Sequence, residues 1–347
     1  MSAFCGGTIS LYPNGGVIVM GHRRSSPFLY GIFVGNLKHE MSLISLIAAL
    51  LLEQWRPLSD RRLLYTAVSQ YAGYFEHQFN AGEKHHGIIA WMVAVLPLVL
   101  GAWIVYAVLW HINPLLGLVF NVAALYVTMG FRQFSHYFTD IQLALKQEDL
   151  PRARELLAAW RGHSCAELSA EDVIRLTVEQ ALAASYRNVF SVIFWFVLLP
   201  GPTGAVLYRL SYYLEQRWGK TQLPDLSVFG GFAARAFALI DWIPVRLTAL
   251  TFAIVGDFED ALYCWRSQAG RWEDPSTGIV ISAGAGALGV RLGNPYMRGG
   301  VVVERPELGL GDEPDLAHLD STVGLVWRTL VLWLCMLFLL GIASVLR

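Results

Sequence analysis

Two charged residues stand out because they lie inside an apolar stretch, Phe237–Gly256, which reads FALIDWIPVRLTALTFAIVG. Asp241 and Arg246 flank Pro244 near its middle. A charged side chain at the centre of a bilayer costs at least ~2.5 kcal/mol, so such residues normally face protein or water. Proline removes a backbone donor and clashes with the preceding helical turn. We therefore predict two short helices that meet at residues 241–244, with a candidate functional site at the break.

The chemistry of this charged pair has two interpretations. Asp241 and Arg246 would lie about 140° apart around a straight helix and would not pair there. A break at Pro244 could bring them together as an internal ion pair that locks the bend. It could also direct them to separate partners in a polar ligand site. The residue types alone leave both interpretations open.

Other patterns that resemble functional motifs have simpler explanations. Residues Gly284–Gly289, GAGALG, match GxGxxG, but no βαβ unit surrounds them, so close helix packing by small residues explains them better. His85 and His86, with His77 upstream, have no carboxylate partner at a recognised metal-ligand spacing, and we predict no metal site. The sequence contains no P-loop and no assignable Ser/His/Asp arrangement.

The composition is that of a membrane protein. The chain has 347 residues, of which 55% are hydrophobic and 15% charged, and its mean hydropathy is +0.45. Soluble domains carry about 25% charged residues. The net charge of −1 gives no basic surface, which excludes nucleic acid as a partner and leaves the lipid bilayer as the predicted one. The four cysteines are scattered and indicate neither a disulfide framework nor a zinc site.

About four to five hydrophobic segments predict an all-α polytopic integral membrane protein, since a span needs about 20 apolar residues. The first two carry no charge and flank a tight turn at His111–Pro114. Pro200–Gly204 should interrupt the third. The segments are residues 88–110, 112–131, 188–208, the stretch 237–256, and 329–346.

Polar segments alternate with these spans and are predicted to form amphipathic helices packed on the membrane domain. They cover residues 53–87, 132–187 and 257–322. Within the second, a helix should start at Leu150-Pro151 and end at Gly162, and Ser169 with Asp172 should form the capping box of another. The turn at 111–114 lacks Lys and Arg, whereas both neighbouring polar segments carry several. The positive-inside rule therefore places the turn outside and the polar segments in the cytoplasm.

The first 40 residues differ from the rest because they are rich in Gly and Ser and lack a periodic pattern. Met41 opens the run MSLISLIAALLLEQW, which reads like a natural start. We expect residues 1–40 to be a disordered or wrongly assigned extension. Residues 41–347 should form a single membrane domain.

Three sequence blocks, in chain order, resemble one family: FWFVLLPGPTGAVLYR, IDWIPVRLTALTFAIVG and AGALGVRLG. From Met41 to Arg347 the chain is similar to the adenosylcobinamide-phosphate synthases (CobD/CbiB) of late cobalamin biosynthesis. It also resembles their AmpE relatives, which are linked to β-lactamase regulation. The resemblance implies a multi-pass enzyme of the bacterial inner membrane that joins aminopropanol to a corrinoid carboxyl. It implies Mg²⁺ and ATP as cofactors, and a corrinoid or another anionic or amphipathic ligand.

The departures from this family concern polar residues above all. Glu179 matches a family glutamate that active members follow with a Glu-Asn pair and an aspartate; Ala183, Ala184 and Arg187 stand there instead. Later blocks have Tyr212 for asparagine, Glu215 for aspartate, Phe237 and Ala238 for two adjacent aspartates, and Asp241 and Ser276 for asparagines, while Gly278 is retained.

These departures remove oxygens that could hold Mg²⁺–ATP and add a positive charge. The first hypothesis is therefore a catalytically degenerate, AmpE-like protein with a ligand-binding or regulatory role. The second is an active synthase, with Glu179, Glu215 and Asp241 as catalytic candidates. The third is a structural membrane partner without a ligand. The ligand-binding candidates are Arg246, Arg291, Ser276 and Gly278.

Overall fold

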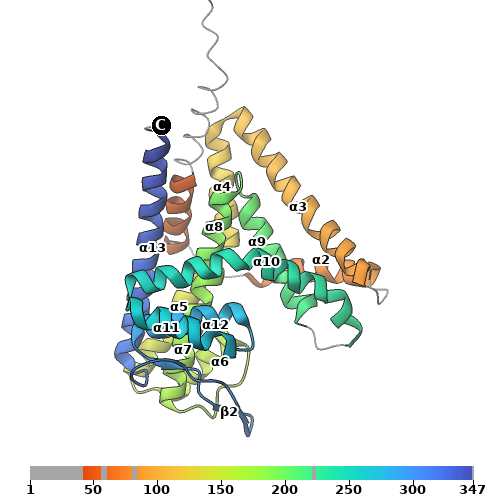
Figure 1. Ribbon diagram of the computed structural model, residues 1–347. Helices are drawn as coiled ribbons and strands as arrows, with labels where there is room; N and C mark the ends of the chain where they lie inside the picture. Colours follow the sequence, from red (N-terminus) through yellow and green to blue (C-terminus); the bar gives the residue numbers. More distant parts are fainter. Residues whose placement is uncertain (1–41, 56–60, 80–83, 221–223, 346–347) are drawn as a thin grey trace, which may run out of the picture.

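The computed structural model describes residues 42–55, 61–79, 84–220 and 224–345 (Figure 1), and the expectation for residues 1–40 lies outside this part of the chain. The described residues are mostly helical. Four helices are long and apolar enough to cross a membrane: His85–Ile112, Ala170–Leu198, Phe229–Val255 and Leu316–Ala343. The prediction of an all-α polytopic membrane protein is confirmed.

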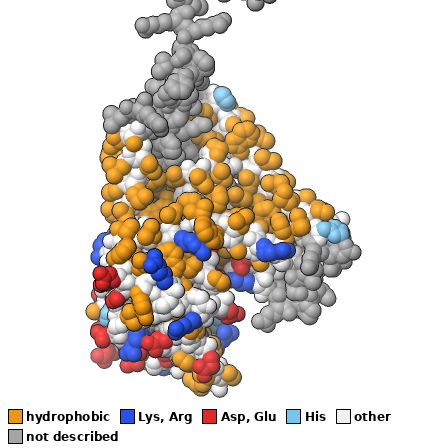
Figure 2. All heavy atoms as spheres, in the orientation of Figure 1, with side chains coloured by type: hydrophobic (Ala, Val, Ile, Leu, Met, Phe, Trp, Pro, Cys, Tyr) orange, Lys and Arg blue, Asp and Glu red, His pale blue; other side chains and the backbone are white. Residues whose placement is uncertain are grey.

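One end of the molecule is an apolar bundle. Figure 2 shows hydrophobic side chains over this end, whereas charged side chains gather at the other, which we call the base. Asn113 caps the second helix of an antiparallel pair, accepting a hydrogen bond from the Leu115 N–H at 2.9 Å. The bundle contains helix Ser42–Trp55, α3 (Lys84–Ile112), α4 (Pro114–Thr128), α8 (Ser191–Leu198), α9 (Thr203–Leu214) and most of α13 (Leu316–Val345).

The turn between α8 and α9 confirms the predicted interruption at Pro200–Gly204. The two helices approach so closely that a Cβ on Gly204 would lie 1.8 Å from the carbonyl oxygen of Trp195. Only glycine fits there. A second helix pair, α2 (Arg61–Phe79) and α3, is joined by a hydrogen bond of 2.9 Å from the Tyr71 hydroxyl to the Ala94 carbonyl.

The base contains shorter helices, and their ends confirm local predictions. Gly162 ends α6 in the left-handed conformation, with φ of 75°. Ser169 and Asp172 form the predicted capping box at the start of α7. The helices of the base are α5 (Phe131–Lys146), α6 (Leu150–Arg161), α7 (Ala170–Ser185), α11 (Phe258–Gln268), η3 (Ala269–Arg271) and α12 (Pro275–Leu288).

Helix α7 does not end where the predicted polar segment ends. It continues through the π-helical turn η1 (Tyr186–Phe190) into α8, so one unbroken helix leads from the base into the bundle. A second π-helical turn, η2 (Glu215–Gly219), follows α9. Both wide turns lie where the bundle meets the base (Figure 1).

Residues 290–309 correct the prediction that the segment 257–322 is helical. Strand β1 (Arg291–Leu292) pairs antiparallel with β4 (Leu308–Gly309), and β2 (Tyr296–Arg298) pairs with β3 (Val301–Val303). Gly293, Gly299, Gly300 and Gly309 have positive φ angles here, a conformation that interrupts a helix. These glycines favour tight turns instead.

Helix α10 (Pro224–Val255) corrects the prediction of two short helices. It is continuous, with Pro244 inside it. The missing N–H of Pro244 leaves the carbonyl of Ile240 without its usual donor. The indole nitrogen of Trp195 donates to that carbonyl at 3.1 Å, so a neighbouring helix satisfies the acceptor. The helix therefore continues through the proline.

Close packing explains the GAGALG sequence, which lies in α12. A Cβ on Gly286 would lie 2.5 Å from the carbonyl oxygen of Asp260 in α11, and one on Gly284 would lie 2.7 Å from the Leu182 side chain. Larger residues would separate α12 from these neighbours. The glycines are used for helix packing, as predicted.

Candidate functional site

Asp241 is fully buried on α10 and lies between two tyrosines. Its Oδ2 accepts a hydrogen bond of 2.9 Å from the Tyr186 hydroxyl, and its Oδ1 accepts one of 3.0 Å from the Tyr208 hydroxyl. Tyr186 begins the π-helical turn η1, and Tyr208 lies on α9. A side-chain hydrogen bond also links Asp241 to Ser276 on α12. Both carboxylate oxygens are therefore occupied by protein donors.

Arg187 continues this arrangement toward the base. Its guanidinium donates 2.5 Å and 2.6 Å hydrogen bonds to Asp274 Oδ2 and Thr277 Oγ1, and its Nε lies 3.3 Å from the Tyr186 hydroxyl. It also lies 5.7 Å from the ring centre of Tyr212, within reach of a cation–π interaction. Arg187 therefore joins α12 to the start of η1.

Lys220 extends the arrangement to the end of η2. Its ammonium lies 3.9 Å from Asp274 Oδ2 and 3.7 Å from Glu215 Oε1. The side chain of Lys220 is 43% exposed, so this end is open to solvent. We call the whole set the polar network: Asp241, Tyr186, Tyr208, Ser276, Arg187, Thr277, Asp274, Lys220 and Glu215.

The two π-helical turns place the network. Such turns are rare and occur often at functional sites, because the extra residue redirects the side chains that follow. Tyr186 and Arg187 are consecutive in η1, yet one faces Asp241 and the other faces Asp274. Glu215 starts η2, and Lys220 follows its last residue. Local backbone geometry therefore brings α7, α9, α10 and α12 to one polar centre.

The two carboxyl groups nearest the base have pKa values displaced in opposite directions. Burial raises the pKa of Glu215 above its ordinary value of 4.5, and the nearby Lys220 and Arg187 only partly offset this. Burial also acts to raise the pKa of Asp274, but Arg187, the Thr277 hydroxyl and Lys220 together lower it below 3.8. Asp274 is therefore the more firmly ionised of the two.

These residues do not fit Mg²⁺–ATP, the group that the family resemblance implies. Mg²⁺ needs several oxygen ligands in octahedral geometry. Both oxygens of Asp241 accept tyrosine hydroxyls, and Asp274 and Glu215 face the cations Arg187 and Lys220. In the described ranges, no group of three His, Cys, Asp or Glu residues could hold a metal ion. The exposed cation suits an anionic group better than a metal.

The structure brings several predicted site residues together. Asp241, Glu215 and Ser276 belong to the polar network. Gly278 lies on the same helix as Ser276, but a Cβ there would lie 2.4 Å from the carbonyl oxygen of Ala269. Gly278 therefore allows close packing of α12 against η3.

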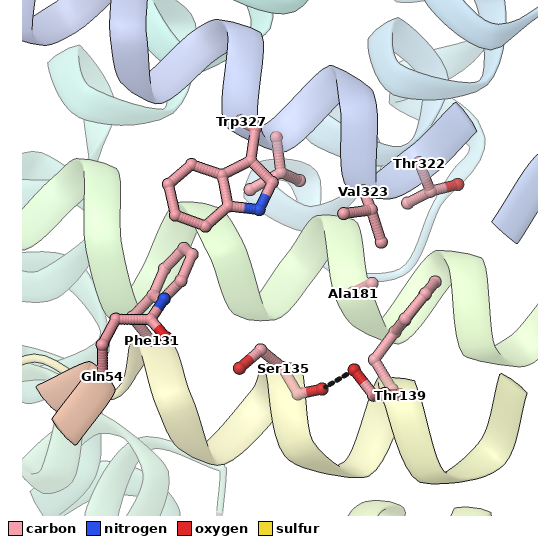
Figure 3. A pocket seen from close by; sticks show the side chains of 10 residues that line it. Gln54, Phe131, Ser135, Thr139, Ala181, Thr322, Val323 and Trp327 are labelled. Carbon is pink, nitrogen blue, oxygen red and sulfur yellow. Dashed lines mark hydrogen bonds between the residues drawn. The ribbon is translucent and has the colours of Figure 1, made fainter. Parts of the chain in front are cut away.

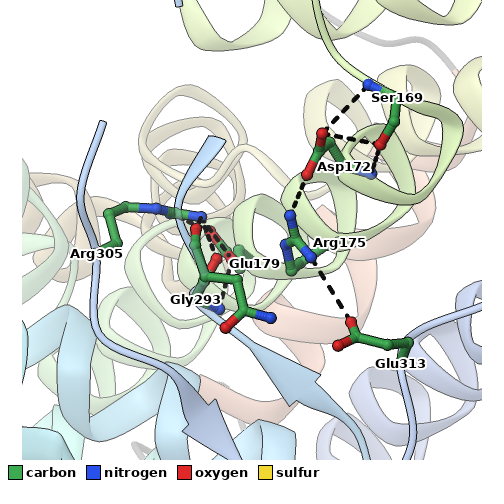
Figure 4. Close-up of polar contacts among 8 residues, drawn as sticks. Ser169, Asp172, Arg175, Glu179, Gly293, Arg305 and Glu313 are labelled. Carbon is green, nitrogen blue, oxygen red and sulfur yellow. Dashed lines mark hydrogen bonds and ion pairs between the residues drawn. The ribbon is translucent and has the colours of Figure 1, made fainter. Parts of the chain in front are cut away.

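Glu179 lies apart from the network, in an ion pair with Arg305 (Figure 4). Arg305 donates bonds of 2.7 and 3.1 Å to the two carboxylate oxygens, and the N–H of Gly293 donates another at 3.0 Å. The side chain of Glu179 is only 4% exposed. Glu179 therefore links α7 to the strand region, by which we mean residues 290–309.

Arg291 also lies apart from the network. Arg291 is 3.6 Å from Glu313. Figure 4 shows Glu313 facing the buried Arg175, at a distance of 3.6 Å. Arg175 also pairs with Asp172, so these charges tie the strand region to the start of α7. Arg291 is therefore part of a second, more exposed ionic cluster.

Arg246 and Asp241 do not form the internal ion pair that was one interpretation of the sequence. Arg246 donates a 2.9 Å hydrogen bond to the carbonyl of Trp242 on its own helix and stacks over the Trp242 ring at 4.2 Å. Asp241 faces the tyrosines instead. Because α10 is continuous, the two charged side chains stay on different faces.

Five network residues were not predicted: Tyr186, Tyr208, Asp274, Thr277 and Lys220. The tyrosines lie in apolar sequence, where an aromatic ring is usually a core residue. Asp274 precedes Pro275, a pattern typical of a helix start, and it is the N-cap of α12. Its carboxylate, however, makes no capping hydrogen bond and pairs with Arg187. Only the tertiary contact gives it a place in the site.

A separate cavity of about 220 Å³ lies between helix Ser42–Trp55, α5, α7 and α13 (Figure 3). Phe131 and Trp327 stack edge to face beside it, with ring centres 5.2 Å apart. The Thr139 hydroxyl donates to the carbonyl of Ser135 at 2.8 Å. None of the residues that line the cavity is charged. It therefore offers shape and apolar surface but no group for acid–base chemistry.

These observations define a class: a polytopic helical membrane protein whose polar centre lies where an apolar bundle meets a charged base. Comparison with known proteins is more specific. A family model described as CobD/Cbib protein matches residues 46–326. The chain therefore belongs to the CobD/CbiB family.

Named relatives agree with this assignment. A Stutzerimonas stutzeri protein called Cobalamin biosynthesis protein CobD is 37% identical over 302 residues, which cover 86% of this chain and 97% of the relative. The protein of the same name from Chromobacterium violaceum is 38% identical over 247 residues, or 71% and 77% of the two chains. That from Yersinia enterocolitica is 30% identical over 245 residues, or 67% and 76%. No solved structure matches the chain.

Proposed function

We propose that this chain is a catalytically degenerate member of the CobD/CbiB family, with a ligand-binding or regulatory role of the AmpE kind. One observation carries the proposal. Arg187 stands where the family resemblance implies an aspartate, and its guanidinium pairs with Asp274 at the centre of the polar network. With a cation and two engaged carboxylates, the network leaves few free oxygens for the Mg²⁺–ATP that a ligase would need.

The positions of the family departures support this proposal. Arg187, Glu215, Asp241 and Ser276 come from four separate segments and meet in the polar network. Phe237 packs its ring against Tyr208 and Tyr212, with centres 5.6 and 5.5 Å apart. The substitutions are thus mutually compatible and form a packed, hydrogen-bonded centre. The partners of these polar side chains are supplied by the protein itself.

The network suggests the chemistry of the ligand. The side chain of Lys220 is half-exposed at the end of the network that is open to solvent, so a carboxylate or phosphate group could pair with it. Arg187, which pairs with Asp274, adds a second positive charge nearby. The apolar bundle beside it suits the hydrophobic part of an amphipathic molecule. A corrinoid with an anionic side chain is one member of this class.

The proposed location is the bacterial inner membrane, with the base in the cytoplasm. Lys and Arg side chains gather at the base and its border with the bundle (Figure 2), whereas the α3–α4 turn at 111–114 lies at the other end (Figure 1). The positive-inside rule favours this orientation.

An active synthase is the second candidate, because near-full-length relatives carry the name Cobalamin biosynthesis protein CobD. Glu215 and Asp241 would then act in rearranged roles. Glu215 has the better chemistry for proton transfer, since burial raises its pKa toward neutrality.

Complementation separates the two candidates. A bacterial strain that lacks its own adenosylcobinamide-phosphate synthase would receive either this chain or the Stutzerimonas relative, with membrane levels of both measured. We expect the relative to restore cobalamin-dependent growth and this chain to fail. Growth supported by this chain would contradict the degenerate role, and loss of that growth in Glu215→Ala or Asp241→Ala would support the synthase.

A gain-of-function variant provides a second test. The triple substitution Arg187→Asp, Phe237→Asp and Ala238→Asp restores carboxylates at positions where the family resemblance implies them. Matched substitutions Arg152→Asp, Leu143→Asp and Tyr263→Asp at exposed positions of the base control for added negative charge. Partial growth with the first variant alone would show that the missing oxygens limit the reaction.

A further inference from the structure

Helix α10 runs crosswise to the other long helices. Its start contacts α3, where a Cβ on Gly87 would lie 2.1 Å from the carbonyl oxygen of Phe229. Its far end contacts α13, where the Trp333 indole donates a 3.2 Å hydrogen bond to the Thr251 hydroxyl. Figure 1 shows α3 and α13 on opposite sides of the bundle, with α10 passing between them at the border with the base. This path lies across the bundle rather than along it.

The outer face of α10 is a stripe of exposed residues with one half-buried member, Arg246. Their spacing of three or four keeps them on one side of the helix. Leu239 is 78% exposed, Trp242 54% and Ile254 54%. The stripe consists of Arg235, Leu239, Trp242, Arg246, Leu250 and Ile254. The face therefore combines apolar residues with two arginines, as in helices that lie at a membrane surface.

Three arginines at this border have no carboxylate partner within the described part of the chain. Arg235, Arg246 and Arg328 each donate to a backbone carbonyl four residues earlier in their own helix, at 3.0, 2.9 and 3.2 Å. Arg328 lies on α13 beside the exposed Trp327. Figure 2 shows Lys and Arg side chains along the lower edge of the hydrophobic surface, and acidic side chains further into the base. These positive charges are available to an external anion.

A transmembrane path for α10 would be costly. The apolar part, Phe229–Val255, has 27 residues. Arg246 would then lie about 6 Å from the bilayer centre, on a lipid-facing surface. A charged side chain at this depth is costly unless it faces protein or water. A helix in the plane of the membrane avoids this cost, because Arg235 and Arg246 both reach the headgroups.

We propose that α10 lies in the plane of the cytoplasmic membrane surface and that Arg235, Arg246 and Arg328 bind the headgroups of anionic phospholipids. The negative potential of such a surface attracts basic side chains that lie close to it. Leu239, Trp242 and Ile254 insert between the acyl chains. The polar network is on the opposite, buried face of α10, so the lipid surface and the candidate site share one rigid helix.

Spin-label depth measurements test the path of the helix. The four native cysteines would be replaced by alanine, and single cysteines introduced as Leu239→Cys or Leu250→Cys would be labelled in the full chain in nanodiscs. Eleven positions along a helix correspond to about 16 Å. We expect depths that agree to within about one helical turn, ~5 Å. A depth difference of about 16 Å between the labels at positions 239 and 250 would mean that α10 crosses the bilayer, and would overturn the proposal.

Thermal unfolding tests the lipid. The protein would be compared in nanodiscs of phosphatidylcholine and of phosphatidylcholine with phosphatidylglycerol. We expect phosphatidylglycerol to raise the wild-type Tm by a few degrees. In the triple variant Arg235→Gln, Arg246→Gln, Arg328→Gln, this increase in Tm should be at most half as large. The corresponding Arg→Lys variant should retain most of it, which separates lost charge from misfolding.

A matched control uses the base. The variant Arg152→Gln, Arg271→Gln, Arg298→Gln removes the same charge from exposed positions away from the border. It should keep the wild-type response to phosphatidylglycerol. An equal loss in this control, or an unchanged response in the border variant, would show that net charge rather than these three arginines determines lipid binding.

Discussion

The indole nitrogen of Trp195 donates a hydrogen bond to the carbonyl of Ile240 across 3.1 Å, and this carbonyl is the acceptor that Pro244 leaves without its helical partner. A residue on α8 thereby compensates for a proline in α10. The contact keeps Asp241, one position after Ile240, directed at Tyr186 and Tyr208. A continuous α10 and an intact polar network depend on the same hydrogen bond.

Trp195→Phe should therefore destabilise the protein by about 1–2 kcal/mol, because it leaves the part-buried carbonyl of Ile240 unsatisfied. The cost should be smaller in a Pro244→Ala background, where the new N–H can donate to Ile240. Thermal unfolding of the two single variants and the double variant in detergent measures this coupling. Trp103→Phe, at a 46% exposed position on α3, is the control. Additive effects of the two substitutions would contradict the compensation.

Asp274 and Glu215 should give opposite dependences of stability on pH. The folded-state pKa of Asp274 lies below 3.8, so its stabilising contribution is present above that value and is lost as the pH falls through the folded pKa. Asp274→Asn should lower the Tm at neutral pH, and its difference from wild type should shrink in acid.

The folded-state pKa of Glu215 lies above 4.5, so its contribution decreases as the pH rises from 4.5 through the folded pKa. Glu215→Gln should therefore raise the Tm at neutral pH or leave it unchanged. Unfolding curves between weakly acidic and neutral pH measure both variants. A lower Tm for Glu215→Gln at neutral pH would show that its contact with Lys220 outweighs the effect of burial.

Breaking the Glu179–Arg305 pair should release the strand region from α7. Their side chains are 4% and 13% exposed, so Glu179→Gln leaves a largely buried guanidinium without its charge partner, at a cost of about 3–5 kcal/mol. Hydrogen exchange should increase in residues 291–309. The exposed pair Arg152–Glu155 provides the control, and Glu155→Gln should cost less than about 1 kcal/mol. Equal effects would argue against a structural role for Glu179.

Two glycines of α3 should respond in opposite directions to alanine. A Cβ on Gly87 would lie 2.1 Å from the carbonyl oxygen of Phe229, so Gly87→Ala must move α3 away from α10, at a cost of about 1–3 kcal/mol. Gly101 has no atom within 4 Å of such a Cβ. Gly101→Ala should stabilise the helix by up to about 1 kcal/mol. Thermal unfolding distinguishes the two, and a neutral Gly87→Ala would contradict the close helix contact.

The sequence determined the local features of the fold, because each depends on residues that are close in the chain. Apolar length predicted the long helices, Pro200–Gly204 predicted the turn between α8 and α9, and Ser169 with Asp172 predicted the start of α7. The position of Asp241 inside an apolar stretch singled it out, and family resemblance added Glu215 and Ser276; all three lie in one network. Whether they act in catalysis stays a prediction.

Only the tertiary structure decided how these elements are used, since the deciding partners are distant in the chain. Proline usually breaks a helix, yet the Trp195 indole supplied a donor from another helix and α10 remained continuous. Tyr186 and Tyr208 look like core residues until Asp241 lies between their hydroxyls. A hydrogen bond needs two groups about 3 Å apart, and no pattern along the chain specifies that distance.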